Sequence, residues 1–294
     1  PAGTLPPLQG RLLIRDGTAK MVRANAGSYE VTKLDAEADF KTLNDIAARF
    51  DLILADGSKL AGEATLQGPL SQGELNLATA SGTLRLKTDR PVDVGPLAVL
   101  AGQAGLAGGV SVDLNAAIDA GALQGQVALA VTGLQSAQRA AASAAPIDAE
   151  LQGQVRWADN QLVSNFDLSG AAGQARVALD YRHTEQPLSL TADRIMSAVL
   201  TGEPLALPDF SVQAHATVDI ARLGQAAPEL LGVRAGAELT GGRLEIAQLT
   251  VQGGAQPVVN AALVLKDLAA RRGDQPVQLD TLTFNLDSAL EPGQ

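Results

Sequence analysis

The chain contains no cysteine, and only 3% of its 294 residues are aromatic. Without cysteine it can form neither disulfide bonds nor thiolate metal or redox sites. A compact core of this size normally uses more phenylalanine, tyrosine and tryptophan, because each of them buries a large area. The scarcity of aromatic residues therefore favours a thin, extended sheet over a thick globular core.

Basic residues are also in short supply, since 22 Lys and Arg stand against 32 Asp and Glu, which gives a net charge of −10. Nucleic-acid binding depends on cationic side chains that neutralise phosphates, so we expect no nucleic-acid partner. The charge argues equally against electrostatic docking on anionic lipid headgroups. Acidic residues scattered singly along polar faces are typical of a solvated surface.

Long hydrophobic runs are missing as well. The most apolar stretch, 92–112, is interrupted by several glycines and by Asp93, Pro96 and Gln103, whereas a membrane-spanning helix needs about 20 mostly apolar residues. The chain begins at Pro1, with neither an initiating methionine nor a signal peptide. We therefore expect a segment of a larger protein, with any anchor or export signal outside this sequence.

No group of residues predicts catalysis. The sequence has neither a nucleotide-binding P-loop nor a G-x-S-x-G nucleophile elbow. The two histidines, His183 and His215, have no second histidine or cysteine at metal-ligand spacing, and there is no D-x-D-x-D-G calcium loop. We expect a protein that is not an enzyme and that uses no metal or cofactor.

What the sequence does contain is a regular alternation of apolar and polar residues. A period of two indicates strands with one apolar and one polar face, and short turns such as Asp56-Gly57 and Asp159-Asn160 join neighbouring strands. A turn is also expected at Asp16-Gly17. The pattern predicts about sixteen strands. The clearest are expected at 8–14, 50–54, 60–66, 110–118, 123–131, 147–157, 162–168, 175–181, 188–192, 210–218 and 259–265.

Three aspartates precede short apolar runs, and we expect Asp39, Asp93 and Asp219 to cap about three short helices. The clearest helix is expected at 220–231, followed by a hairpin at Thr240-Gly241-Gly242. Two further interpretations are less definite. The Ala-rich stretch 133–146 fits either a short helix or a flexible link, and 268–272 fits a short helical turn.

A similar order of strand, helix and hairpin occurs at 38–68, at 92–133 and at 204–253. Recurrence of one supersecondary unit indicates a modular architecture. We therefore expect one continuous segment of loose repeats near 1–91, 92–203 and 204–294. Because each strand has one apolar face, that segment should be an all-β-dominated, elongated and twisted sheet, mostly an antiparallel meander. The apolar face must be covered by a second sheet or shielded by curling of the sheet into a hydrophobic groove; we expect the groove.

The repeated unit resembles the AsmA-like and TamB-like proteins of the Gram-negative envelope. The resemblance rests on VDIARLGQAAPELLGVRAGAELTGGRLEIAQLTVQG at 218–253, on PVDVGPLAVLAG and GALQGQVALAVTG in the second unit, and on LQGRLLIRDGTAK at 8–20. It implies a repeating β-groove with a hydrophobic interior. It also implies a periplasmic location, with an inner-membrane anchor outside this sequence, and a role in phospholipid transport or outer-membrane assembly.

The sequence and this resemblance together predict a non-enzymatic groove that binds the acyl chains of a phospholipid or another lipid, with inner- and outer-membrane proteins as partners. Smooth aliphatic side chains can hold acyl chains without directional contacts. The expected lining residues are Phe50, Leu52, Leu54, Val112, Leu114, Val127, Leu129, Val155, Phe166, Leu168, Val177, Leu179, Val212, Val218, Leu244, Val259 and Leu263. The alternative is a structural or adhesive surface protein of stacked β-sandwich modules with a closed core.

Overall fold

The computed structural model describes residues 9–23, 27–42, 44–68, 70–71, 74–75, 79–100, 105–136, 145–182, 210–233, 237–252, 258–273 and 275–289. Nearly all of these residues are in strands. The strands are β1 (Gly10–Arg23), β2 (Gly27–Thr42), β3 (Asp45–Leu54), β4 (Lys59–Gln67), β5 (Leu70–Ser71), β6 (Glu74–Leu75), β7 (Ser81–Thr88), β8 (Val92–Asp93), β9 (Leu106–Asp119), β10 (Ala122–Ser136), β11 (Ile147–Ala158), β12 (Gln161–Gly170), β13 (Gly173–Arg182), β14 (Phe210–Asp219), β15 (Ala237–Gln252), β16 (Val258–Arg272) and β17 (Gln275–Ala289). The described helices are α1 (Val94–Leu100), α3 (Ile220–Ala226) and the 3-10 turn η2 (Pro228–Leu231).

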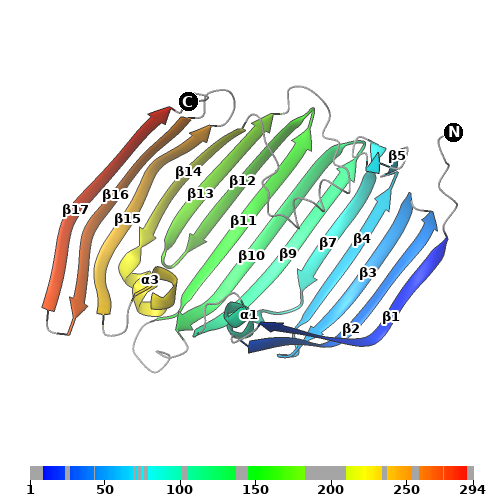
Figure 1. Ribbon diagram of the computed structural model, residues 1–294, viewed down its shortest axis with the longest axis horizontal. Helices are drawn as coiled ribbons and strands as arrows, with labels where there is room; N and C mark the ends of the chain where they lie inside the picture. The colour runs from blue at the N-terminus through cyan, green and yellow to red at the C-terminus, as the bar shows by residue number, and fades with distance from the viewer. Residues whose placement is uncertain are drawn as a thin grey trace.

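The strands form one open antiparallel sheet of 15 strands, so the expected all-β meander is confirmed (Figure 1). The sheet order is β1-β2-β3-β4-β7-β9-β10-β11-β12-β13-β14-β15-β16-β17, and β8 adds a short pairing to β9. Within the described residues, the only other sheet is the small pair β5–β6. The two outermost strands, β1 and β17, do not meet, so the sheet is not closed into a barrel.

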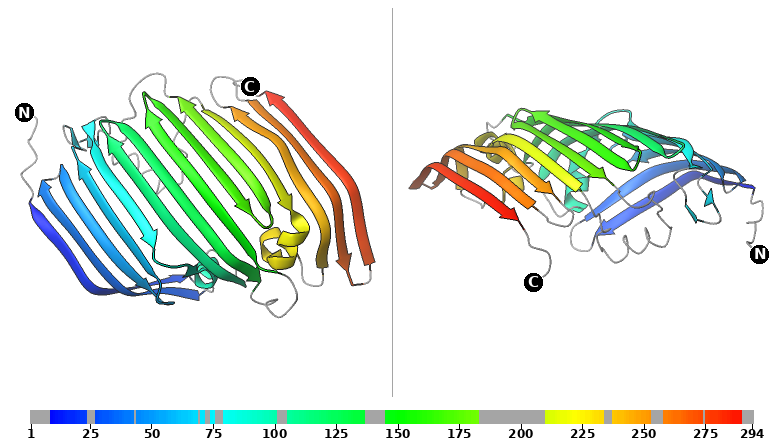
Figure 2. Two further views of the ribbon diagram at one scale, coloured as in Figure 1. Left: turned by 180° about the vertical axis from the view of Figure 1, so that it is seen from behind. Right: turned by 90° about the horizontal axis from the view of Figure 1, so that it is seen from above.

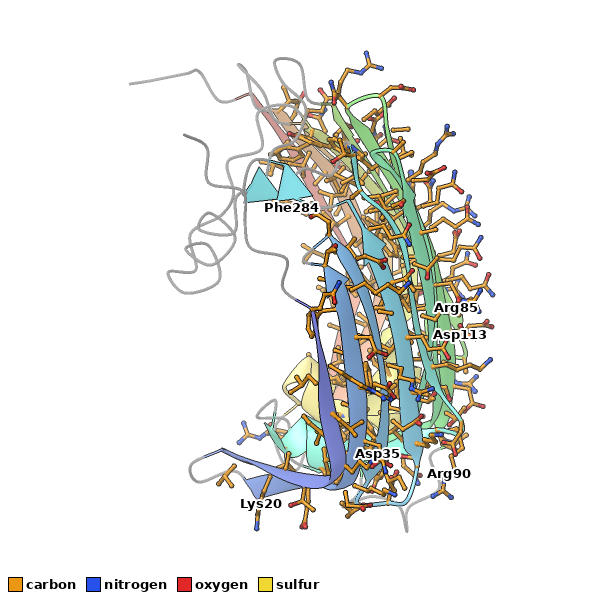
Figure 3. All side chains as sticks on the ribbon, turned by 90° about the vertical axis from the view of Figure 1, so that its right-hand side faces the viewer. Lys20, Asp35, Arg85, Arg90, Asp113 and Phe284 are labelled. Carbon is orange, nitrogen blue, oxygen red and sulfur yellow. The ribbon has the colours of Figure 1, made fainter. Side chains whose placement is uncertain are left out.

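The sheet is curved, and its two faces carry different side chains. Seen from its edge, Arg85 and Asp113 project from the convex side (Figure 3). Because side chains alternate along a strand, the neighbouring Leu84 and Leu114 belong to the other side. We call the side with Leu84 and Leu114 the concave face, and the side with Arg85 and Asp113 the convex face. The curvature is also visible from above (Figure 2).

Both helices lie on the concave side, near the same end of the strands (Figure 3). Helix α1 packs against β9 and β2, and α3 packs mainly against β15. Ala98 of α1, Leu106 of β9 and Ala227, the C-cap residue of α3, form a small buried cluster, with Leu134 packed against it. A second buried cluster consists of Leu54 and Val92, and Val31, Leu52 and Val110 pack against it. The larger part of the concave face lies beyond these two clusters.

The helix caps follow the sequence at two of the three expected positions. The Asp219 carboxylate accepts a hydrogen bond from the Arg222 N–H at 2.9 Å and is the N-cap of α3. The Asp93 carboxylate accepts from the Gly95 N–H at 2.9 Å at the start of α1. The prediction for Asp39 is wrong, because Asp39 lies inside β2, opposite Arg11 and Ala47. Pairing on both sides holds this segment extended, so the described part of the chain has two α-helices rather than three.

Two expected turns are bulges within continuous strands. The pairing register shifts on both sides of Gly241, and β15 runs straight through the predicted hairpin. Pairing with β16 on both sides of this point, of Leu239 with Ala270 and of Arg243 with Lys266, keeps the segment in one strand. Likewise β1 continues past Asp16-Gly17, where the register with β2 shifts.

Of the remaining local predictions, one is wrong, and the others concern residues that lie partly or wholly outside the described ranges. Residues 268–272 are part of β16, because they pair with β17, and they form no helical turn. Residues 133–136 end β10, whereas 137–144 lie outside the described residues. The strand expected at 188–192 and the histidine His183 also lie outside them.

The concave face as candidate functional site

Strand pairing brings apolar residues into rows that cross the whole sheet. Residues directly opposite each other on paired strands point to the same face. One row, which we call the central row, contains only apolar residues and glycine from β1 to β17. Its members are Ile14, Ala36, Phe50, Gly62, Leu86, Leu114, Val127, Gly153, Phe166, Val177, Ala214, Leu249, Ala261 and Leu286. At about 4.8 Å per strand spacing, the row is about 60 Å long.

A neighbouring row is apolar as well, although it is shorter. It consists of Val112, Leu129, Leu151, Leu168, Ala175, Ala216, Ile246, Leu263 and Phe284. The pairing register places all seventeen residues predicted as lining on the concave face. Five of the seventeen belong to the central row: Phe50, Leu114, Val127, Phe166 and Val177.

The concave face is largely uncovered by the described residues. Among the residues whose burial the structure describes, only ten apolar residues are buried, and five of them are alanines. Of the predicted lining residues, Leu54 alone is buried, and Leu168 is 41% exposed. The accessible area of the chain is 18502 Å², compared with about 12,000 Å² for a compact chain of about 30 kDa. Several apolar side chains of the concave face, among them Leu84, Phe284 and Leu286, are exposed.

Two glycines of the central row lie under aromatic rings. A Cβ on Gly62 would be 2.3 Å from the Phe50 ring, and a Cβ on Gly153 would be 2.5 Å from the Phe166 ring. Each ring thus occupies the space above the glycine on the partner strand. As a result, neither phenylalanine projects fully from the sheet, and the central part of the concave face stays even.

Polar residues on the concave face are few. Ser164 lies between Val155 and Leu179, and its hydroxyl is buried without a hydrogen-bond partner among the described residues. The Thr88 hydroxyl accepts from the Val112 N–H at 3.0 Å and so continues the strand pairing. Neither residue places a charge on this face. Binding to it would therefore depend on apolar contact rather than on ionic or hydrogen-bonding groups.

The convex face is held by ion pairs between adjacent strands. Lys87 and Asp113 lie opposite each other, with 3.0 Å between Nζ and Oδ2, and this contact holds the pKa of the Asp113 carboxyl below its ordinary value. The Arg49 guanidinium binds Glu37 at 2.6 Å and, with Arg11, lowers the pKa of that carboxyl. Such exposed pairs contribute little individually to stability.

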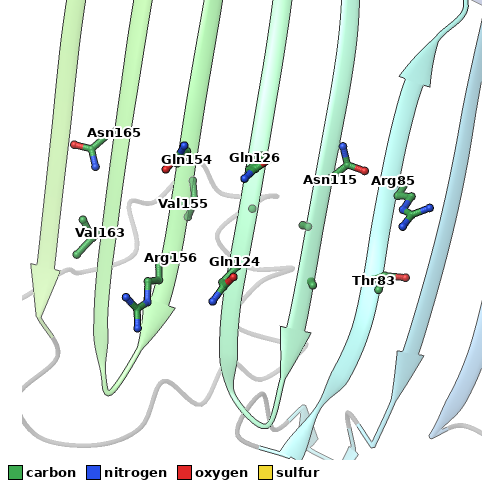
Figure 4. Close-up of a pocket in the computed structure, with 13 residues that line it drawn as sticks. Thr83, Arg85, Asn115, Gln124, Gln126, Gln154, Val155, Arg156, Val163 and Asn165 are labelled. Carbon is green, nitrogen blue, oxygen red and sulfur yellow. The ribbon is translucent and has the colours of Figure 1, made fainter.

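A shallow depression of about 660 Å³ lies on the convex face (Figure 4). Arg85, Asn115, Gln126, Gln154 and Asn165 occupy opposite positions on five successive strands there. Amides and guanidinium groups bind through hydrogen bonds, so this depression suits water and polar molecules. It does not share the chemistry of the concave face.

The described residues show no cluster of metal-ligating side chains. Across the described ranges, no group of three or more His, Cys, Asp or Glu residues is placed to hold a metal ion. The His215 ring nitrogen lies 2.6 Å from the Ala247 carbonyl oxygen and is engaged with the backbone of β15. None of the helices in the described part of the chain is long and apolar enough to cross a membrane.

Comparison with known proteins gives no match: no protein-family model, no curated protein and no solved structure is similar to the chain at a significant level.

Nine members of the central row are absent from the predicted lining set. They are Ile14, Ala36, Gly62, Leu86, Gly153, Ala214, Leu249, Ala261 and Leu286. For some of these residues, the position of the nearest turn in the sequence predicts the residue that lies opposite. Gly62 and Phe50 are equally distant from Asp56, and Gly153 and Phe166 are equally distant from the Asp159-Asn160 turn. Reflection across each turn would have predicted these glycine–phenylalanine pairs.

Proposed function

We propose that the concave face binds the acyl chains of phospholipids or related lipids. The observation that carries this proposal is the central row, which has one member on each strand of the sheet order from β1 to β17 and no polar side chain. Burial of each CH₂ group contributes about 0.8 kcal/mol and needs no directional contact. The close packing of rings over Gly62 and Gly153 suits a flexible hydrocarbon chain, and the curvature of the sheet supports a groove under this proposal.

The proposed cellular location and biological role rest on the resemblance to the AsmA-like and TamB-like proteins. Under this proposal the chain acts in the periplasm, carried by an inner-membrane anchor outside this sequence. It takes part in lipid transport or outer-membrane assembly together with membrane proteins. The open meander sheet is compatible with a β-groove.

The decisive experiment introduces a charge on each face of one strand. Val177 belongs to the central row, whereas the adjacent Ala178 points to the convex face. Val177→Asp should reduce uptake of a fluorescent phospholipid by tenfold or more, because a carboxylate would have to be desolvated against the acyl chain. Ala178→Asp, the matched control, should retain uptake. Circular dichroism would confirm that both variants are folded.

Mass spectrometry of an organic extract tests the same proposal without a probe. Phospholipid should accompany the purified chain and should be depleted from the Val177→Asp protein. An extract free of lipid, together with no uptake of the fluorescent phospholipid, would overturn the proposal. Equal uptake by Val177→Asp and Ala178→Asp would assign the binding to another surface.

Helix α3 is proposed to close one end of this groove. It packs on β15 at the same end as α1, and its C-terminal Ala227 joins the buried cluster of Ala98 and Leu106. Deletion of 220–231 should then change the rate of lipid uptake. If the shortened chain folds and takes up lipid at an unchanged rate, α3 does not close the groove.

The alternative function, a structural or adhesive protein of β-sandwich modules, needs paired sheets with a closed core. The described residues form one large sheet, and the sheet of β5 and β6 is too small to cover it. This observation favours the lipid proposal. Low-angle scattering would separate the two, because a single curved sheet and a row of sandwiches differ in cross-section.

A further inference from the structure

Side-chain amides form a row on the convex face, which is the side of the sheet away from the proposed lipid-binding face. The row consists of Asn115 on β9, Gln126 on β10, Gln154 on β11 and Asn165 on β12, and Arg85 on β7 precedes it. Strand pairing places each of these residues directly opposite the next, as Figure 4 shows. At about 4.8 Å per strand spacing, the row is about 19 Å long.

Most of these amides have no partner in the described part of the chain. Asn115 is engaged, because its Nδ2 donates to the Asp113 Oδ1 at 2.9 Å. Gln126, Gln154 and Asn165 are exposed, and their side chains make no hydrogen bond with a described residue. Each amide has two N–H donors and one carbonyl acceptor, and a hydroxyl group likewise donates and accepts. The row is therefore suited to a ligand with many hydroxyl groups.

Two arginines give the depression around this row a positive charge. Arg85 lies at one end of the row, and Arg156 lies two residues beyond Gln154 on β11, opposite Gln124 (Figure 4). Glu63 on β4 is opposite Arg85, but neither arginine forms an ion pair within the described ranges. The residues that line the depression include no carboxylate. Arg85 and Arg156 are thus free to bind an anion.

The carboxylates that border the row are already paired with other cations. Asp113, two residues before Asn115, contacts Lys87 at 3.0 Å, and Asp167 contacts Arg176 on the adjacent strand. These pairs neutralise the border of the depression without using Arg85 or Arg156. Charge complementarity therefore favours an anionic ligand over a neutral or cationic one.

From the amide row and its two free arginines we propose that this depression binds an acidic oligosaccharide, a chain of sugar units that carry carboxylate groups. The amides hydrogen-bond the sugar hydroxyls, and the guanidinium groups of Arg85 and Arg156 bind the carboxylates. The length of the row suits several linked sugar units. A nucleic acid would need many more cations. An extended peptide would need an unpaired strand edge, whereas this row lies on paired strands inside the sheet.

Fluorescence polarisation with labelled oligogalacturonate tests this proposal, and a labelled neutral maltodextrin of the same length is the reference. The wild-type chain should bind oligogalacturonate at least tenfold more tightly, and added salt should reduce this preference because the charges are exposed. Arg85→Gln with Arg156→Gln should abolish the preference. Arg222→Gln with Arg272→Gln, the control, removes the same charge from α3 and β16 and should keep it. Circular dichroism would confirm that each variant is folded.

The amides and the independence from the lipid groove are tested with the same probe. Gln126→Ala with Gln154→Ala should weaken the binding of both oligosaccharides several-fold. Val177→Asp, which is designed to block lipid uptake on the opposite face, should bind oligogalacturonate like the wild type. No binding of oligogalacturonate at low salt would overturn the proposal, as would equal affinity for the neutral chain. A preference that survives Arg85→Gln with Arg156→Gln would also overturn it.

Discussion

At the residue scale, Gly153 is required by the ring that covers it. A side chain at this position would meet the Phe166 ring at 2.5 Å and Val127 at 2.7 Å. We expect Gly153→Val to reduce the free energy of unfolding by about 1–3 kcal/mol, the usual cost of overpacking. Urea unfolding would measure the loss.

The matched control for this substitution is Gly125→Ala on the neighbouring strand β10. An added Cβ there lies 3.7 Å from Ala116 and 3.9 Å from Val155, which is ordinary contact, so stability should be retained. The second control is the double variant Gly153→Val with Phe166→Ala, in which removal of the ring should recover part of the loss. A fully stable Gly153→Val protein would show that the ring moves aside freely.

Asp56 couples the β3–β4 turn to the start of β8. Its carboxylate accepts hydrogen bonds from the Ser58 hydroxyl at 2.5 Å and the Ser58 N–H at 2.9 Å, and from the Asp93 N–H at 2.7 Å. Partial burial tends to raise the pKa of Asp56, but these hydrogen bonds and the nearby Arg90 outweigh it and lower that pKa.

The contribution of Asp56 to the free energy of unfolding should therefore decrease as the pH falls. A carboxyl whose pKa is lower in the folded state stabilises the fold above its unfolded pKa, about 3.9 for Asp, and loses this contribution as the pH falls through the folded value. We expect Asp56→Asn to be less stable than the wild type at neutral pH, and the difference to shrink below about pH 4. Urea midpoints across this range would measure it. A difference that grows on acidification would contradict the assignment.

At the scale of elements, α3 is a short helix that depends on its cap. It has seven residues, and Asp219 satisfies the Arg222 N–H at its first turn. We expect Asp219→Ala to lower the free energy of unfolding by about 1 kcal/mol, whereas Asp219→Asn, which can still cap, should lose much less. Denaturant unfolding compares them. Equal losses in both variants would point to the charge of Asp219 rather than to capping.

Residue pairs that favour turns have different outcomes in different elements. Asp159 and Asn160 adopt positive φ and form the two-residue turn between β11 and β12, as their sequence indicated. Gly241 and Gly242 have a similar local signature, yet they form a bulge under α3. A local motif marks where the backbone can bend, and packing with a distant element decides whether it turns back or continues.

At the scale of the whole molecule, the concave face predicts selectivity for chain length rather than for headgroup. Each additional CH₂ group that reaches the face should contribute about 0.8 kcal/mol, or about fourfold in affinity. We expect affinity to rise from lauroyl to myristoyl to palmitoyl lysophospholipids and to change little with salt or headgroup charge. Competition against a fluorescent phospholipid would measure the series. An affinity set mainly by headgroup charge would contradict apolar binding.

The sequence by itself determined the class of fold and much of the local pairing. Alternation marked the strands, and compact turns fixed the register of their hairpins. Leu114 and Val127, for example, are equally distant from the Ala120-Gly121 turn and lie opposite each other. This works because a short turn leaves few ways to align the two strands that it joins. The predicted lining residues accordingly fall on one face.

The tertiary structure alone decided how the hairpins join and what remains uncovered. β7 pairs with β9 although β8 and α1 lie between them, and β13 pairs with β14 across 183–209. The central row exists only because these long-range registers agree. A period of two places apolar side chains on one face but does not state whether a second layer covers that face. That outcome depends on contacts between residues far apart in the sequence, and here the described strands form a single curved layer.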